Sequence, residues 1–383
     1  MTVFPTLDHP AWWLAAFIIG ICVGSFLNVV IYRMPLGISV NEPKRSFCPG
    51  CKSAIPMSRN IPLISWLALR GRCPDCKGRI SFRYFAVELL TGLLFCAVWW
   101  VVVGRAGAER VEMAHAVVFP LWFLVSALVA LSFIDAEHLI IPLELTISST
   151  VAGVLAALLM PELPDLVAWS SIDPGWKDGL KSSILGGVIG YFGLWAVVLL
   201  GKLAFGKTEW KHEDAVAWRL EEPKGEEEPI RFHMGSETVD WWDLFFRKSD
   251  KLVIECDTVR INGDEAVPGE VVIREDGVTF ADGRHVILEE VKSLEGTAKR
   301  AVVPREAMGM GDVHLMGVIG AFFGWFGVFF ALLAGSLLAI AAAVLGRVGF
   351  GMRLPFGPFL AMGALCWLFG GWKIAEWYLA SLR

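Results

Sequence analysis

The chain has 383 residues, of which 55% are hydrophobic, and it includes 17 Trp and 25 Phe. This composition excludes a single soluble globular domain, because apolar runs of about 20 residues require a membrane around them. The net charge of −5 conceals an acidic stretch, 206–300, with 14 Lys and Arg against 23 Asp and Glu, which predicts a soluble insert within a membrane body.

The first apolar run, 11–31, ends just before Arg33. It is longer than the apolar region of a signal peptide, no basic region precedes it, and no small-residue cleavage site follows it. The segment 1–33 is therefore predicted to be a retained first transmembrane helix.

The loop that follows, 34–83, is rich in Lys and Arg, which the positive-inside rule places in the cytoplasm. It contains two matching knuckles, Cys48-Pro-Gly-Cys51 and Cys73-Pro-Asp-Cys76. Two such turns place four thiolates in the tetrahedral arrangement of a closed structural Zn²⁺ site. The alternative is a pair of disulfides or a redox dithiol. A cytoplasmic location disfavours stable disulfides, and a lone redox pair does not explain a repeated knuckle.

Seven further apolar segments predict a polytopic α-helical membrane protein with about eight transmembrane helices. Successive transmembrane helices place successive loops on opposite sides of the membrane. Counted in this way, the loops with few Lys or Arg lie outside and the short loop with Arg347 and Arg353 lies inside. Four segments lie in the predicted domain 84–205, and three lie in the domain 306–383. The seven segments are 84–103, 115–134, 142–160, 181–205, 312–324, 325–346 and 356–378.

The insert, 206–305, differs from the membrane segments in its pattern. Short β-branched runs alternate with Asn-Gly and Asp-Gly pairs, which favour tight turns. We expect a small, mostly β domain, with a charged stretch around 221–228. Helix counting places this domain in the cytoplasm, because long loops follow the charge rule poorly.

Two aspartates lie at the ends of apolar segments. Asp135 ends the third segment, and Asp312 opens the sixth within Gly309-Met-Gly311-Asp312. Ionisable groups at membrane depth are costly and are therefore functional candidates. Helix counting places both at the cytoplasmic face, where one ionised and one protonated carboxyl could hydrolyse a peptide bond. The alternative is that each simply lies at a helix end.

Several motifs occur in one order along the chain: Gly24-Ser-Phe-Leu-Asn28, the two cysteine knuckles, Asp135 with Ile141-Pro142, Gly309-Met-Gly311-Asp312 and Pro355-Phe-Gly-Pro358. In this set the chain resembles the bacterial type IV prepilin peptidases, which are GxGD-type intramembrane aspartyl proteases. The resemblance implies that Asp135 and Asp312 are the catalytic pair of an inner-membrane enzyme active at its cytoplasmic side. It implies removal of a short basic leader from prepilins or type II secretion pseudopilins. It also implies N-methylation with S-adenosylmethionine and zinc in the cysteine loop.

The expected partners are thus these substrates and the lipid bilayer, with no nucleic acid. The sequence contains no Gly-rich cofactor loop, so the cofactor-binding residues are not identified. The chain departs from the family pattern at His314, where Lys is usual, at Leu143, where Asp is usual, and in the 206–305 insert. The alternative function is a zinc-bearing membrane scaffold of a pilus or secretion machine, without catalysis.

Overall fold

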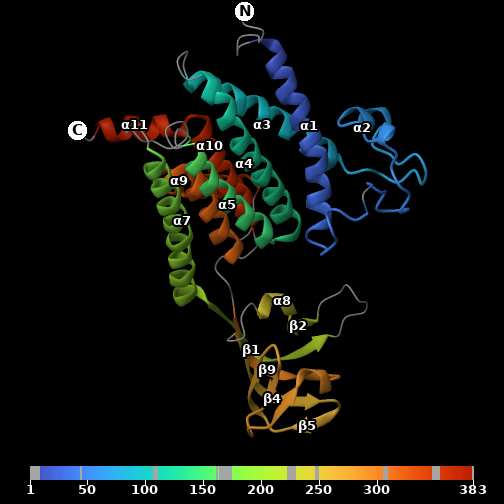
Figure 1. Cartoon of the computed structure of the whole chain (residues 1–383). Coiled ribbons are helices and arrows are strands. Elements are labelled where there is room, and N and C mark those ends of the chain that lie inside the picture. The colour runs from blue at the N-terminus through green and yellow to red at the C-terminus, as the bar shows by residue number, and fades with distance from the viewer. Residues whose placement is uncertain are drawn as a thin grey trace, which may run out of the picture. The chain divides into compact units, whose positions relative to one another are not determined.

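The structure, a computed structural model, describes residues 9–43, 45–106, 111–160, 163, 175–221, 230–245, 250–304, 309–346 and 354–381. The chain divides into two compact units, which are described separately. One unit comprises Met1–Trp195 and Met310–Arg383, and the other comprises Ala196–Gly309. Figure 1 shows that the first is built of helices and the second largely of strands.

Long apolar helices form the first unit. Among the described residues, five helices are long and apolar enough to cross a membrane: α1, α3, α4, α7 and α9. α5 has 17 residues, fewer than the roughly 20 that usually span a bilayer. The elements are α1 (Pro10–Arg33), η1 (Met57–Arg59), α2 (Ile64–Ala68), α3 (Phe82–Ala106), α4 (Val111–His138), α5 (Leu143–Leu159), α7 (Trp176–Phe205), α9 (Met310–Leu345), α10 (Gly357–Cys366), η3 (Trp367–Gly371) and α11 (Trp372–Ser381).

Helix α4 lies at the centre of this unit. Of its most apolar membrane-spanning stretch, 72% is buried, against 22% for α7 and for α9. It packs against α1, α3, α5 and α10. Neighbouring helices approach each other closely where a glycine of one helix faces the other helix. A methyl group built on Gly24 would lie 2.7 Å from the Cα atom of Glu88, so α1 and α3 are in backbone contact.

The helix boundaries differ from the sequence prediction in several places. The predicted segment 356–378 comprises α10, η3 and α11, and Gly370 within it is not helical. The predicted segments 312–324 and 325–346 form one element, α9, with a kink at Gly324, whose φ of 66° and ψ of −174° are not helical. The predicted segment 181–205 starts too late, since α7 begins at Trp176. Its first turn carries Asp178, which suits the positive end of a helix but interrupts the apolar pattern from which the start was predicted.

The second unit is an antiparallel sheet, which agrees with the expected β character of the insert. The strand order is β3-β2-β1-β9-β4-β6-β7-β8, and β5 pairs with β4. The elements are β1 (Lys207–Glu221), β2 (Arg231–Met234), β3 (Glu237–Asp240), α8 (Trp241–Leu244), β4 (Leu252–Ile261), β5 (Asp264–Ala266), β6 (Gly269–Ile273), β7 (Gly277–Thr279), β8 (His285–Ile287), η2 (Leu288–Glu290) and β9 (Leu294–Pro304).

Local sequence explains the turns and the core of this sheet. Asn262 and Gly263 have φ values of 52° and 90° and join β4 to β5, as the Asn-Gly signal predicts. Trp218 and Phe232 are almost completely buried in its core. Apart from Glu221, the charged stretch predicted around 221–228 lies outside the described residues, as does the loop with Arg347 and Arg353.

Candidate functional site

Asp135 lies in the last turn of α4 and is only 6% exposed. Its Oδ2 atom accepts a hydrogen bond of 2.9 Å from the backbone N–H of Gly357, the first residue of α10. N–H groups in the first turn of a helix have no partner within that helix, and they stabilise a negative charge. A methyl group built on Gly357 would lie 2.8 Å from the same oxygen, so glycine leaves room for this contact.

Asp312 lies in the first turn of α9 and is 8% exposed. It follows Gly311, which packs against Ile141, six residues after Asp135. The two aspartates are 177 positions apart in the sequence. The structure therefore brings them together in the interior of the helical unit, where α10 packs against both α4 and α9 (Figure 1).

Ile141 connects the two aspartate motifs. A methyl group built on Gly311 would lie 2.6 Å from the Cβ atom of Ile141, and one built on Gly357 would lie 3.1 Å from its Cδ1 atom. The Ile-Pro segment after α4, the glycines before α9 and the start of α10 thus meet around one isoleucine. Two buried carboxyls in this setting can supply a carboxylate and a carboxylic acid in one site, as peptide hydrolysis requires.

The four predicted zinc ligands form a cluster. The sulfur atoms of Cys48, Cys51, Cys73 and Cys76 all lie within 4.8 Å of one another, and all four cysteines are free thiols. Such a set of sulfur ligands fits the tetrahedral coordination of Zn²⁺. Hydrogen bonds with Ser53 lower the pKa of the Cys51 thiol to about 6. The pKa of Cys76 moves the other way, to about 11, because a hydrogen bond from Gly78 that lowers it is outweighed by the neighbouring sulfurs of Cys51 and Cys73.

The two knuckles share one backbone conformation. In each, the N–H of the first cysteine donates to a carbonyl five residues later, Ser53 for Cys48 and Gly78 for Cys73. In each, the lysine after the second cysteine has a φ near +60°, as Lys52 and Lys77 show. The repeated sequence therefore folds into a repeated turn.

The structure also gives positions to Arg33, at the end of the first apolar segment, and to His314 and Leu143, the two single-residue departures from the family pattern. Arg33, only 3% exposed, donates to the carbonyl oxygens of Ser39, Val40 and Pro43 and thereby ties the loop to α1. His314 lies on α9, and its ring contacts that of Tyr191 on α7, with centroids 5.2 Å apart. Leu143, at the start of α5, is half-exposed.

Sequence reasoning missed the roles of Gly357 and Ile141. Pro358, at the second position of α10, was the one available signal, because proline near a helix start marks that start. It does not indicate which side chain the freed N–H group meets.

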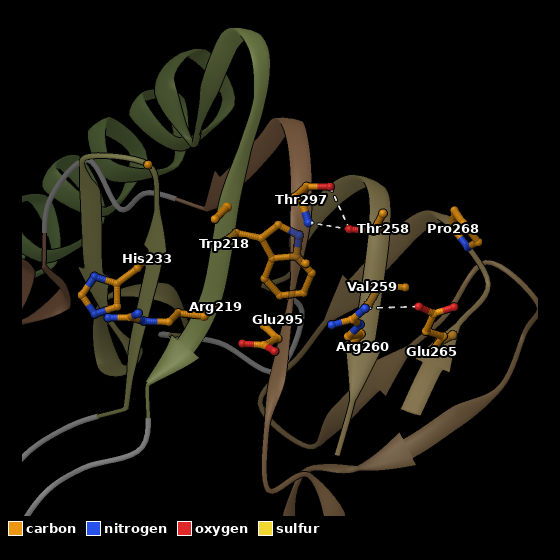
Figure 2. A pocket seen from close by; sticks show the side chains of 14 residues that line it. Trp218, Arg219, His233, Thr258, Val259, Arg260, Glu265, Pro268, Glu295 and Thr297 are labelled. Atoms are coloured by element: carbon orange, nitrogen blue, oxygen red, sulfur yellow. Dashed lines mark hydrogen bonds and ion pairs between the residues drawn. The ribbon is translucent and has the colours of Figure 1, made fainter. Parts of the chain in front are cut away.

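The sheet unit has a hollow of its own, a groove of about 670 Å³ that crosses strands β2, β1, β9, β4 and β5. In the register of the sheet, Arg219 pairs with Glu295, Glu295 with Arg260, and Arg260 with Glu265. Figure 2 shows these charged side chains along the groove, beside the Thr258–Thr297 hydrogen bond of 2.8 Å. Alternating charges of this kind suit a solvated face.

The helices, the two carboxyls and the cysteine cluster define a multi-pass membrane protein with a buried acidic site and a loop whose four cysteines could hold a metal ion. Comparison with known families agrees with that class. The bacterial peptidase A24 N-terminal domain matches residues 18–102, and the type IV leader peptidase family matches residues 286–344.

Several relatives carry the name prepilin leader peptidase/N-methyltransferase. The Dichelobacter nodosus protein is 36% identical over 240 residues, which cover 56% of this chain and 75% of that one. The Myxococcus xanthus protein is 41% identical over 187 residues, with 49% of this chain and 48% of that one covered. This chain belongs to the prepilin leader peptidase/N-methyltransferase family. No solved structure matches it.

Proposed function

We propose that this chain is a membrane aspartyl endopeptidase that removes the short basic leader from type IV prepilins or type II secretion pseudopilins. The observation that carries the proposal is that the motifs of Asp135 and Asp312, 177 residues apart, meet around Ile141, which lies against both Gly311 and Gly357. Buried carboxyls are rarely brought together without a functional reason, because each carries a desolvation cost.

The two carboxyls have different surroundings, and this difference suggests their roles. The N–H of Gly357 holds one oxygen of Asp135, which favours Asp135 as the carboxylate that takes a proton from the attacking water. Asp312 then gives its proton to the carbonyl oxygen of the scissile bond. When the tetrahedral intermediate collapses, the C–N bond breaks and the proton held by Asp135 passes to the leaving amine. Asp312 takes a hydroxyl proton back as the carbonyl of the acid product re-forms, and this restores both carboxyls to their starting states.

We propose a structural Zn²⁺ ion for the four-cysteine cluster and S-adenosylmethionine as the donor for methylation of the new N-terminus. When bound, S-adenosylmethionine supplies an electrophilic methyl group that the free amine can attack. The cysteine geometry supports the metal, and the relatives' name supports a methyl donor.

We further propose that the protein lies in the bacterial inner membrane with its active site on the cytoplasmic side. The basic loop 34–83 supports this orientation. In this arrangement α1, α3, α4 and α7, the two halves of α9, α5 and the α10–α11 region make up about eight membrane helices. The insert 206–305 would then form a cytoplasmic domain.

The test is to incubate the purified full chain with a leader-bearing prepilin peptide and read the products by mass spectrometry. The proposal predicts cleavage at the end of the leader and, with S-adenosylmethionine present, a product heavier by one methylene group. The family resemblance implies that a Gly precedes the cut. A peptide in which this Gly is replaced by Val serves as the control and should stay intact. Failure of folded, zinc-loaded protein to cut the native peptide would favour the scaffold alternative.

A further inference from the structure

The short connection between α4 and α5, residues 139–142, is restricted in its backbone. Leu139 has a φ of 55°, a left-handed conformation that ends α4, and its N–H donates to the backbone carbonyl of Asp135 at 2.9 Å. Pro142 is the N-cap of α5, and a proline limits the residue before it to extended conformations. Ile141 therefore lies on a segment whose conformation is fixed at both ends and which is hydrogen-bonded to one of the two aspartates.

The side chain of Ile141 turns inward from this connection, toward the aspartate motifs. Its apolar neighbours Leu139 and Ile140 are 47% and 46% exposed. In contrast, the Cβ atom of Ile141 lies 2.6 Å from a methyl group built on Gly311, and its Cδ1 atom lies 3.1 Å from one built on Gly357. The isoleucine therefore occupies the space that side chains on these two glycines would take, between the start of α9 and the start of α10.

Each of the two glycines is directly connected to one aspartate. Gly311 precedes Asp312 in the chain, and the N–H of Gly357 donates to Asp135 at 2.9 Å. An isoleucine side chain is stiff because it branches at Cβ, so it keeps the two glycines at a set distance. We infer that Ile141 is a positioning residue that holds Asp135 and Asp312 at the spacing peptide hydrolysis requires. This inference rests on the proposed peptidase function.

A residue that only packs the α4–α5 connection would behave differently from a positioning residue. If Ile141 only packed, its truncation would lower the melting temperature, and activity would fall only as folded protein is lost. A positioning residue lowers kcat in folded protein and leaves KM nearly unchanged, because the geometry of the reacting groups is disturbed and substrate binding is not. Ile141→Ala should therefore lower kcat for leader cleavage about 10-fold and change KM less than about twofold.

The contacts of Ile141 also predict that a small residue at one position compensates a larger one at another. Ile141→Val removes Cδ1, the atom that faces Gly357, and keeps Cβ, the atom nearest to Gly311. By itself it should lower kcat about threefold. In Gly357→Ala the new methyl group needs the space of Cδ1, so the same change should instead raise kcat at least about threefold. In Gly311→Ala the new methyl group meets Cβ, so Ile141→Val should not raise kcat.

Steady-state kinetics of the purified full chain on a leader-bearing prepilin peptide measure all these variants. The matched control is Ile140→Val, which removes the same methyl group from the preceding, half-exposed side chain. It should leave kcat of the wild type and of both glycine variants unchanged. Melting temperatures show whether each variant is folded, and the Ile141→Ala result depends on neither glycine variant.

Two results would overturn the inference and leave the peptidase proposal intact, since the wild type would still cut the leader. One is folded Ile141→Ala protein with the kcat of the wild type. The other is a change by Ile141→Val that has the same sign and size in the wild type and in both glycine variants. A wild type that leaves the peptide uncut would instead contradict the proposed function, on which the inference rests.

Discussion

At the residue scale, the contact between Asp135 and Gly357 decides how the acidic site works. The hydrogen bond of 2.9 Å fixes one carboxylate oxygen, and glycine is the residue that permits it. A side chain at this position would have to displace either Asp135 or the start of α10. Packing this tight transmits a small change in volume directly to the Asp135 carboxyl, which we propose to be catalytic.

Gly357→Ala should therefore lower kcat for leader cleavage about 10-fold or more, equivalent to about 1.4 kcal/mol of transition-state stabilisation. The added methyl group would lie 2.8 Å from Asp135 Oδ2 and 3.1 Å from Ile141 Cδ1. Gly193→Ala makes the same change on α7, where a methyl group meets no atom within 4 Å. Steady-state kinetics of both variants check the prediction, and equal activity of the two would contradict it.

A second residue-scale effect concerns charge in the sheet unit. Hydrogen bonds from Lys211 and Arg300 lower the pKa of Glu209 to about 2, from an ordinary value of 4.5. The distances are 2.5 Å to Lys211 and 2.9 Å to Arg300. Because the pKa is lowered in the folded state, the stabilisation is complete above about pH 4.5 and is lost as the pH falls toward 2.

Glu209→Gln should accordingly lower the melting temperature of the sheet unit at pH 7, and the difference from the wild type should shrink as the pH falls from 4.5 toward 2. Far-ultraviolet circular dichroism of the full chain measures this melting. Glu265→Gln removes an exposed partner of Arg260 and should have little effect at any pH. A difference for Glu209→Gln that stays constant across this pH range would contradict the assignment.

At the scale of elements, the two cysteine knuckles act as one structure. Ser53 belongs to the first knuckle and donates a hydrogen bond of 2.7 Å to Asp75 in the second. Cys48 and Cys73 are buried, whereas Cys51 and Cys76 are exposed, so each knuckle contributes one inner and one outer sulfur. A bound metal would hold the two turns together in a loop that has little other regular structure.

Replacement of Cys48 or Cys73 by Ser should abolish stoichiometric zinc binding and lower the melting temperature by at least about 5 °C. Elemental analysis and calorimetry of the reduced protein measure the two effects. Cys366→Ser is the control, since that thiol lies outside the cluster. Reduced wild-type protein without zinc would contradict the proposed metal site, and chelation without loss of stability would contradict its structural role.

At the scale of the whole molecule, the features that could be predicted from the sequence are those that residues close together in the chain determine. The cysteine cluster follows from a repeated four-residue turn, and the Asn262-Gly263 turn follows from its residues. The predicted division between segments 312–324 and 325–346 falls at the non-helical Gly324, although both segments belong to the one element α9. The α7 start was misplaced because a polar first turn hides a helix from an apolar pattern.

The convergence of Asp135, Asp312 and Gly357 depends on how α4, α9 and α10 pack. The residues that set this packing are distant in sequence and carry no local signal. The meeting of the two aspartates could therefore be expected only from the family resemblance.

The central claim is that Asp135 and Asp312 act together on the scissile peptide bond. The most direct measurement is the rate of leader cleavage by Asp135→Asn and Asp312→Asn, with Asp178→Asn as the control. Asp178 also lies in the first turn of an apolar helix, but it is half-exposed and distant in sequence from both motifs. The account predicts that each of the first two variants loses at least about 1,000-fold in kcat while the control keeps its activity. Cleavage by either variant at the wild-type rate would contradict it.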